Sequence, residues 1–337
     1  MTLLKSFAPV AALVSALGVA APTVAQDQPA EFTFQCGTLG SVAYTVGNAM
    51  QEMFADNQDV RIISAEGAGA TAATVNLMNN PAWKSSIGCT TVLDHAYARL
   101  GVEPFFAEAV DISGDVKVLF NYLYAAVGFV TTDDELNAVS DLDGMTVAAG
   151  RRGQANWGGI PAMMVENGLP AAEVSFEFLG TDPSHEAVSD GRMSTTATQV
   201  PVFPDGSKAF TPGVLSKLIA SGRDLHPLSF TEEHFENARA AGLPFQSITL
   251  APGVLPIETD EPVTWVFSPG MITVNKDFPE EAAYEIVRTM IDRAEELPDY
   301  QALLETIATP ARLLGQTTRA ELHPGAARAF EEAGLLD

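Results

Sequence analysis

The alternation of apolar and polar positions predicts that strands and helices follow one another along most of the chain. Over residues 31–36 every second residue is apolar, which is typical of a strand with one buried face. Over 41–55 the apolar residues recur at helical spacing, so this segment is predicted to be a helix. Ser41 or Thr38 is expected to cap it, because a hydroxyl oxygen can accept the unpaired N–H groups of the first turn.

Two further strand-to-helix units follow. The segment "VRIISAEGAGA" predicts a strand that enters a glycine-rich turn, and "TAATVNLMNN" predicts the helix after that turn. A third strand, "SSIGCTT", precedes the helical pattern "VLDHAYARLG". Gly101 should end this helix, since glycine readily adopts the left-handed conformation found after helices.

The alternation continues toward the C-terminus. The apolar run 116–133 predicts one or two buried strands, and the glycine-rich loop 150–159 leads into a helix with Pro161 in its first turn and Gly168 at its C-terminal cap. Further strands are predicted in "AEVSFEFLG" and "STTATQVPVF", a helix in "TPGVLSKLIASG", and a long helix over 280–297. This order predicts the α/β class with mostly parallel sheets.

The first 25 residues have the pattern of a cleaved signal peptide. Lys5 precedes the short apolar run "FAPVAALVSALGVAA", and small residues at 23–25 predict cleavage after Ala25. No later stretch approaches the ~20 consecutive apolar residues that cross a bilayer. The mature protein is therefore expected to be exported and soluble.

Composition and charge narrow the classes of partner. The chain has 337 residues, of which 47% are hydrophobic, enough for one large or two ordinary domains with a real core. Its net charge of -25 excludes binding to nucleic acid or anionic lipid, which requires clusters of Lys and Arg. A small anionic ligand is still allowed, because helix N-termini and one arginine can hold it.

Turns made of small residues follow several of the predicted strands. They lie at 37–41, 66–71 and 150–159, with Thr90–Thr91 as a fourth. Strand ends of this kind meet at one edge of an α/β sheet, where helix N–H groups can reach a carboxylate. The candidate ligand residues here are Thr38, Ser41, Tyr44, Gly69, Thr71, Thr90 and Thr91. The alternative interpretation is a set of ordinary strand-to-helix turns with capping residues.

The pair Arg151–Arg152 is unusual, because the chain has only 18 Lys and Arg residues. A guanidinium group binds a carboxylate through two parallel hydrogen bonds. Gln154 and Asn156 could add an amide clamp and Trp157 a stacking face. The alternatives are a solvated arginine pair that balances the acidic surface, and a Trp157 ring that packs on its own helix.

Other chemistry is not indicated by the sequence. The histidines lack metal-ligand spacing and no catalytic motif is found, so we expect no metal site, no cofactor and no catalytic set. The two cysteines, Cys36 and Cys89, each end an apolar run. Export permits a disulfide between them, and two small buried thiols are the alternative.

In their order and spacing, several segments resemble the TAXI-type substrate-binding proteins of TRAP (tripartite ATP-independent periplasmic) transporters. The resemblance covers nearly the whole mature chain. The segments are "CGTLGSVAYTVGNAM", "EGAGATAATVNLM", "SSIGCTTVLDHAYARLG", "SDLDGMTVAAGRRG", "APGVLPIETDEPVTWV" and "ITVNKDFPEEAAYEIVRTMID".

The resemblance implies a type II periplasmic binding protein fold, in which two α/β lobes enclose a ligand cleft. Lobe I would contain 26–127 plus 266–337, and lobe II would contain 128–265. In this topology the first and third strands are neighbours, which favours the disulfide between Cys36 and Cys89.

The implied function is capture of a small carboxylate in the periplasm, such as glutamate or a related amino or oxo acid, for delivery to membrane permease subunits. The protein would be a monomer and not an enzyme, and Gln199 joins the ligand residues. Three departures lie near the expected ligand, so the ligand can differ from the family's. "GQANWGG" replaces Gly-Ser-Gly-Thr, Thr71 or Thr74 must replace a serine, and "STTATQVPVFPDGSKAFTPG" is long and polar.

Two other functions fit the same pattern. An exported enzyme on a similar two-lobed fold would need a titratable cluster in the cleft, for which Asp94, His95 and Glu66 are the candidates. A ligand-sensing protein that docks on a receptor kinase would have the same binding residues.

Overall fold

The computed structural model describes residues 29–38 and 41–336. The predicted signal peptide and its cleavage site lie outside the described residues. The strands form one ten-stranded mixed sheet in the order β2-β1-β3-β10-β4-β7-β5-β6, with β8 beside β4 and β9 beside β10.

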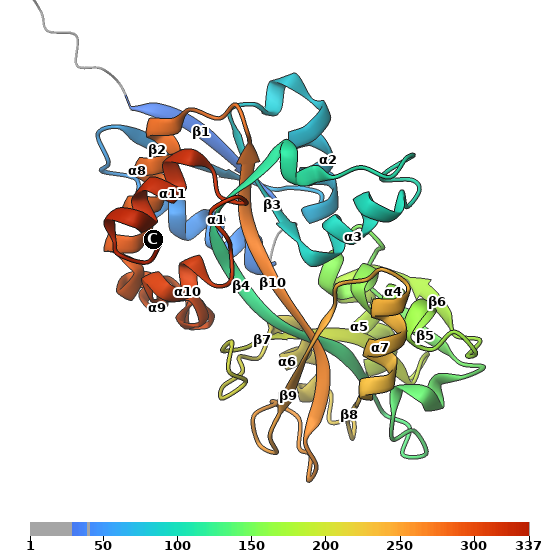
Figure 1. Cartoon of the computed structure of the whole chain (residues 1–337). Coiled ribbons are helices and arrows are strands. Elements are labelled where there is room, and N and C mark those ends of the chain that lie inside the picture. The colour runs from blue at the N-terminus through green and yellow to red at the C-terminus, as the bar shows by residue number, and fades with distance from the viewer. Residues whose placement is uncertain (1–28, 39–40, 337) are drawn as a thin grey trace, which may run out of the picture.

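Two parallel groups of strands form the ends of this sheet, and each belongs to one lobe (Figure 1). The first lobe contains β1 (Ala30–Gln35), β2 (Val60–Ala65) and β3 (Ser86–Thr91). The second contains β5 (Thr146–Ala149), β6 (Ser175–Phe178) and β7 (Thr195–Pro201). The two-lobed α/β architecture expected from the sequence is confirmed, whereas the lobe boundaries stay a prediction.

Two long strands join the lobes. β4 (Val116–Thr131) and β10 (Val263–Asn275) run antiparallel to each other through the middle of the molecule (Figure 1). The expectation of mostly parallel sheets is wrong, because β10 is antiparallel to β3, β4 and β9, and β4 is antiparallel to β7 and β8. The shorter strands are β8 (His226–Leu228) and β9 (Gln246–Leu250). The run 116–133 gives one strand.

Helices follow the parallel strands as predicted. Those after the first-lobe strands are α1 (Val42–Met53), α2 (Ala70–Asn79) and α3 (Val92–Leu100). Those of the second lobe are α4 (Ile160–Gly168), α5 (Thr181–Ser189), α6 (Gly213–Ala220) and α7 (Glu232–Ala240). The C-terminal helices α8 (Glu280–Asp292), α9 (Leu297–Tyr300), α10 (Pro310–Leu314) and α11 (Pro324–Glu332) return to the first lobe (Figure 1).

Several predicted helix ends can be compared with the structure. Ser41 caps α1 by accepting a hydrogen bond from the Tyr44 N–H at 3.2 Å, and Gly101 follows α3 with a left-handed φ of 65°. Pro161 lies in the first turn of α4. Gly168 does not cap α4, because it is still helical and Leu169 follows as the cap.

The predicted helix over 280–297 is wrong in its length. α8 ends at Asp292, and a short 3-10 turn, Ala294–Glu296, precedes α9. Pro298 lies in the first turn of α9, where its missing N–H and fixed φ are tolerated, whereas they would disrupt a continuing helix.

The predicted disulfide is present between Cys36, after β1, and Cys89, in β3, with their Cα atoms 5.5 Å apart. The strands β1 and β3 are parallel neighbours, as the resemblance implied. The disulfide therefore fixes the two strand ends from which the first-lobe loops start.

The long polar stretch after β7 folds back on itself and reaches the first lobe. A bridge pairs Val202 with Ala209, and Gly206 makes the turn with φ 72°. Lys208 forms an ion pair with Glu305, and the Arg312 guanidinium lies 4.1 Å from the ring centre of Phe203. This segment, named here the 203–210 hairpin, thus connects the lobes a second time.

Candidate functional site

The loops that were predicted to meet do so where the lobes touch, a region named here the junction. Gly69 lies at the start of α2 with a φ of 111°, a conformation that side chains rarely allow. A methyl group on Gly69 would lie 2.8 Å from the carbonyl oxygen of Gly153. The second-lobe loop therefore reaches the first lobe because Gly69 has no side chain.

The first two turns are also tied to each other. The Gly67 N–H donates to the Gly37 carbonyl at 2.9 Å, and the Gly69 N–H donates to the Cys36 carbonyl at 2.7 Å. These two N–H groups are thus used within the protein. The turn beside them includes residues 39–40, which lie outside the described residues.

A buried carboxylate organises the ends of β3 and α2. Asp94 accepts hydrogen bonds from the Thr71 hydroxyl at 2.7 Å, the Thr90 hydroxyl at 3.3 Å, and the Thr91 N–H and hydroxyl at 2.7 and 3.0 Å. Burial raises the pKa of Asp94, and these hydrogen bonds oppose that rise. The three threonines hold α2 and α3 in place through Asp94, and their predicted contact with a ligand stays a prediction.

Three buried polar side chains join the second lobe to the strand that returns from it. The Asn156 amide donates to the Gln199 Oε1 at 2.6 Å, and the Ser268 hydroxyl donates to the Asn156 Oδ1 at 2.8 Å. In the described part of the chain, the Gln199 Nε2 has no hydrogen-bond partner. Asn156 and Gln199 thus come together as predicted, and one amide donor is left over.

The two adjacent arginines have different surroundings. Arg152 forms an ion pair with Glu166 at 2.8 Å, and its guanidinium lies 4.5 Å from the ring centre of Phe178. Arg151 is exposed and has no ion pair with any residue that the structure describes. Its Nε lies beside Gly180, which precedes α5. Arg151 is therefore the arginine that remains available to an anion.

The other predicted residues have local roles or partners. The Gln154 side chain accepts a hydrogen bond from the Arg151 N–H at 2.9 Å, which closes the loop. Trp157 meets the His185 ring edge to face at 5.6 Å. Thr38 and Tyr44 are half-buried near the start of α1.

Sequence reasoning missed Ser268 and Tyr122 at the junction, and it considered Asp94 only as a candidate for catalysis. Asp94 follows Thr91 by three positions, and this Thr-x-x-Asp spacing is a readable capping signal. Ser268 precedes a Pro-Gly pair inside a strand, an unusual pattern that indicates a close approach. The Tyr122 ring occupies the space beside Gly270, 2.8 Å from where a methyl group would lie. Burial, with a smaller contribution from Asp94, raises the pKa of Tyr122.

Two searches of the described residues bear on other functions. No group of three or more His, Cys, Asp or Glu side chains within 29–38 and 41–336 is arranged to hold a metal ion. In the same residues, no helix combines the length and apolarity that a membrane crossing requires.

Several solved structures share this fold, among them the periplasmic binding protein BugD. BugD has a TM-score of 0.52 at 12% identity, over 92% of this chain and 99% of BugD. MatC from Rhodopseudomonas palustris, with bound malate, has a TM-score of 0.52 at 14% identity, over 91% of this chain and 96% of MatC. R. palustris Rpa4515, with adipate, has a TM-score of 0.54 at 16% identity, over 91% of this chain and 99% of the other. These similarities confirm the predicted binding-protein fold.

The comparison with protein families covers almost the whole described chain. No curated protein matches the sequence. The model of the NMT1-like family matches residues 34–334, which include the helices of both lobes, the two long strands and the C-terminal helices α8 to α11. The chain therefore belongs to the NMT1-like family.

Proposed function

We propose that this protein is the solute-binding component of a TAXI-type TRAP transporter in the periplasm, and that it captures a small carboxylate for delivery to membrane permease subunits. The observation that carries the proposal is the unpaired guanidinium of Arg151 in the loop that touches the first lobe. Arg151 differs in this from the adjacent Arg152, whose guanidinium already forms an ion pair with Glu166.

Two of the solved structures with a similar fold support a carboxylate as the ligand class. MatC is described with malate and Rpa4515 with adipate, and both ligands are dicarboxylates. Their low identity makes this support indirect, so the ligand class rests on the residues of the junction. The segments quoted for the TAXI resemblance support the transporter subtype.

The mechanism is capture by closure of two lobes. β4 and β10 act as the hinge, and the lobes close around the ligand at the junction. Arg151 would hold a carboxylate through charge-assisted hydrogen bonds, and the Gln199 Nε2 would donate a further hydrogen bond. Ser268 and Asn156 position the Gln199 amide, and Gln154 closes the loop that carries Arg151.

The junction favours binding over catalysis. Asp94, the acid considered for an enzyme, accepts hydrogen bonds from Thr71, Thr90 and Thr91 and is completely buried. A general base must instead be able to reach a substrate proton.

The test is a binding measurement on the mature chain with matched arginine variants. Calorimetry with mono- and dicarboxylates, amino acids and oxo acids should find a ligand, and Arg151→Gln should weaken it by about tenfold or more, since one charged hydrogen bond contributes about 1.5–3 kcal/mol. Arg152→Gln is the control, because its guanidinium is already paired, and it should leave affinity nearly unchanged. If no carboxylate binds, or if Arg151→Gln binds as tightly as the parent, the proposal is wrong.

The transporter assignment needs its own test. Proteoliposomes that contain the membrane subunits encoded beside this gene should take up the identified ligand only when the binding protein is added. Uptake that does not depend on it would favour the alternative role as a sensor.

A further inference from the structure

A cavity lies on the opposite side of β10 from the junction. Its volume is about 630 Å³, which is in the range of small-molecule sites. Ser268 of β10 points to the junction, whereas its neighbours Phe267 and Pro269 line this cavity, as does Met271. Because successive side chains of a strand point to opposite faces, the cavity and the junction are on opposite sides of β10. We name it the rear cavity.

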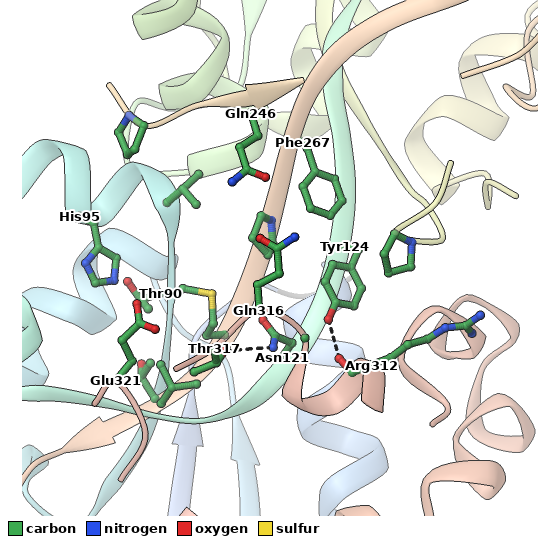
Figure 2. A pocket seen from close by; sticks show the side chains of 18 of the residues that line it. Thr90, His95, Asn121, Tyr124, Gln246, Phe267, Arg312, Gln316, Thr317 and Glu321 are labelled. Atoms are coloured by element: carbon green, nitrogen blue, oxygen red, sulfur yellow. Dashed lines mark hydrogen bonds between the residues drawn. The ribbon is translucent and has the colours of Figure 1, made fainter. Parts of the chain in front are cut away.

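Both lobes contribute to the walls of the rear cavity. α3 and the segment 311–321 belong to the first lobe, and the segments around Pro204 and Gln246 belong to the second. Of the residues predicted to bind ligand, Thr90 also lines this cavity, and among the catalytic candidates His95 does so. Figure 2 shows His95 on one side of the cavity and Tyr124 on the other.

Several polar groups here have no partner in the described part of the chain. Thr273 lines the cavity, is fully buried, and its hydroxyl has no hydrogen-bond partner. The amides of Gln246 and Gln316 extend toward the cavity from opposite ends (Figure 2), and both residues are exposed to solvent. Buried polar groups are normally hydrogen-bonded, so the Thr273 hydroxyl would gain a partner from an occupant, to which the two amides can offer further donors and acceptors.

The charges around the rear cavity cancel. Two arginines and two acids line it, namely Arg99, Arg312, Asp205 and Glu321. Arg312 donates to the Glu305 carbonyl and Glu321 accepts from Thr318, so these two are already engaged. Burial lowers the pKa of His95, which keeps its ring neutral near neutral pH. Asp205 accepts from Ser207, so of these four side chains Arg99 alone has no partner among the described residues, and it is exposed to solvent. The formal charges of the wall sum to zero, which favours an uncharged ligand over an ion.

The apolar part of the wall completes the ligand's description. The Tyr124 and Phe267 rings stack with their centres 5.9 Å apart, and Met271 also lines the wall. We propose that the rear cavity is a second binding site, for a small uncharged molecule that has an apolar ring or chain and an amide-like group with both a donor and an acceptor.

Occupancy of this site should favour closed lobes, an inference that also rests on the hinge in the proposed function. The two sites lie on opposite sides of the hinge strands, so opening the junction would bring the walls of the rear cavity together. A molecule that fills the rear cavity would then oppose opening. By linkage, it would strengthen carboxylate binding, and the carboxylate would strengthen its binding by the same factor.

Three probes of one size and different charge test the site. Benzamide, benzoate and benzylamine share one ring and differ in their polar group. In NMR titrations of the mature chain, we expect benzamide to bind at least about fivefold more tightly than either ion, because the wall has no net charge and the charged probes would lose hydration. Met271→Trp should abolish this binding, since Met271 is half-exposed and a larger ring can extend into the cavity.

Two further variants keep the test decisive if Met271→Trp does not fold. Thr273→Val removes the hydroxyl but keeps the shape, and it should weaken benzamide by roughly two- to tenfold. Arg151→Gln, at the junction, should leave benzamide binding unchanged. The proposal is overturned if benzamide does not bind, if the charged probes bind as well, or if neither cavity variant affects it.

One further measurement distinguishes failure of the rear-cavity proposal from failure of the proposed function. Saturating benzamide should increase the affinity of the parent for the carboxylate found by calorimetry. If benzamide binds without this increase, the coupling between the two sites is wrong, but the proposed rear-cavity site still holds. If no carboxylate binds at all, the proposed function fails, and the benzamide titrations alone decide the rear cavity.

Discussion

The junction and the rear cavity share one strand, β10, but they differ in how their polar groups are used. At the junction, Asn156, Gln199 and Ser268 bond to one another, and Asp94 collects donors from three threonines. In the rear cavity, the hydroxyl of Thr273 is buried without a partner. A paired network holds side chains in one geometry before any ligand arrives, whereas an unpaired group gains a hydrogen bond only from an occupant.

This difference indicates which property of a ligand each region is expected to recognise. Among the described residues of the junction, most donors are paired within the protein, whereas the Arg151 guanidinium and the Gln199 Nε2 are not, so the proposed ligand there would be selected by charge. In the rear cavity the formal charges sum to zero, so the proposed ligand would be selected by shape and by its neutral donors and acceptors.

The largest effect is expected when the contact between the lobes is blocked. Gly69→Ala would place a methyl group 2.8 Å from the Gly153 oxygen and would add backbone strain of about 1–3 kcal/mol. Carboxylate affinity should fall by roughly ten- to a hundredfold in calorimetry. Small-angle scattering with ligand should show lobes that close less completely.

Gly253→Ala is the matched control for Gly69→Ala. Gly253 also has a positive φ, of 81°, but a methyl group there would meet nothing within 4 Å. It carries a similar backbone strain without a contact between lobes, so it should lower stability and keep affinity. Equal affinities in the two variants would show that the Gly69 contact does not govern binding.

A smaller effect is expected from loss of the carboxylate that fixes the first-lobe loops. Asp94→Ala leaves the buried Thr91 N–H and three hydroxyls without their acceptor. The free energy of unfolding in urea should decrease by about 1–3 kcal/mol. Asp94→Asn keeps an acceptor oxygen of similar position and should lose less. If the alanine variant is as stable as the parent, Asp94 does not organise this region.

The pH dependence of stability follows from the same residue. Burial raises the pKa of Asp94, so the folded protein keeps this proton at a pH where the unfolded chain has lost it. The contribution of Asp94 to the free energy of unfolding is then greatest below the ordinary aspartate pKa. It falls as the pH rises through the pKa of the folded state, and it is constant above that pKa. Asp94→Asn should lack this decline in urea unfolding measured from about pH 4 to 8. If the parent and Asp94→Asn lose stability in parallel as the pH rises, the loss comes from other titratable groups.

The sequence predicted the units that depend on local spacing. The strand, turn and helix over 31–55 were found because their periods and the Ser41 cap are local features. The antiparallel strands at the centre were missed, because β10 pairs with β3 and β4 over separations of more than a hundred residues, which no local pattern records. Export and the placement of the two cysteines favoured the disulfide, and the strand order implied by the resemblance strengthened that prediction.

The candidate site shows the same limit. Arg151 and Arg152 are indistinguishable in the sequence, and only the packing of Glu166 and Phe178 against Arg152 separates them. The unpaired hydroxyl of Thr273 depends on tertiary packing and could not be predicted. Asp94 is different, since its spacing from Thr91 was a readable signal.

The smallest effect is expected at the 203–210 hairpin, which joins the lobes beside the rear cavity. The side chains of Lys208 and Glu305 are 47% and 41% exposed, so their ion pair should contribute only about 0–1 kcal/mol. Lys208→Ala should therefore weaken carboxylate binding by less than about fivefold, and added salt should reduce the difference further. Lys217→Ala is the matched control, because its ion pair with Asp182 lies within the second lobe and cannot respond to closure. If Lys208→Ala weakens binding more than Gly69→Ala, the hairpin governs closure instead of the junction, because the weaker of two contacts cannot determine the equilibrium between open and closed lobes.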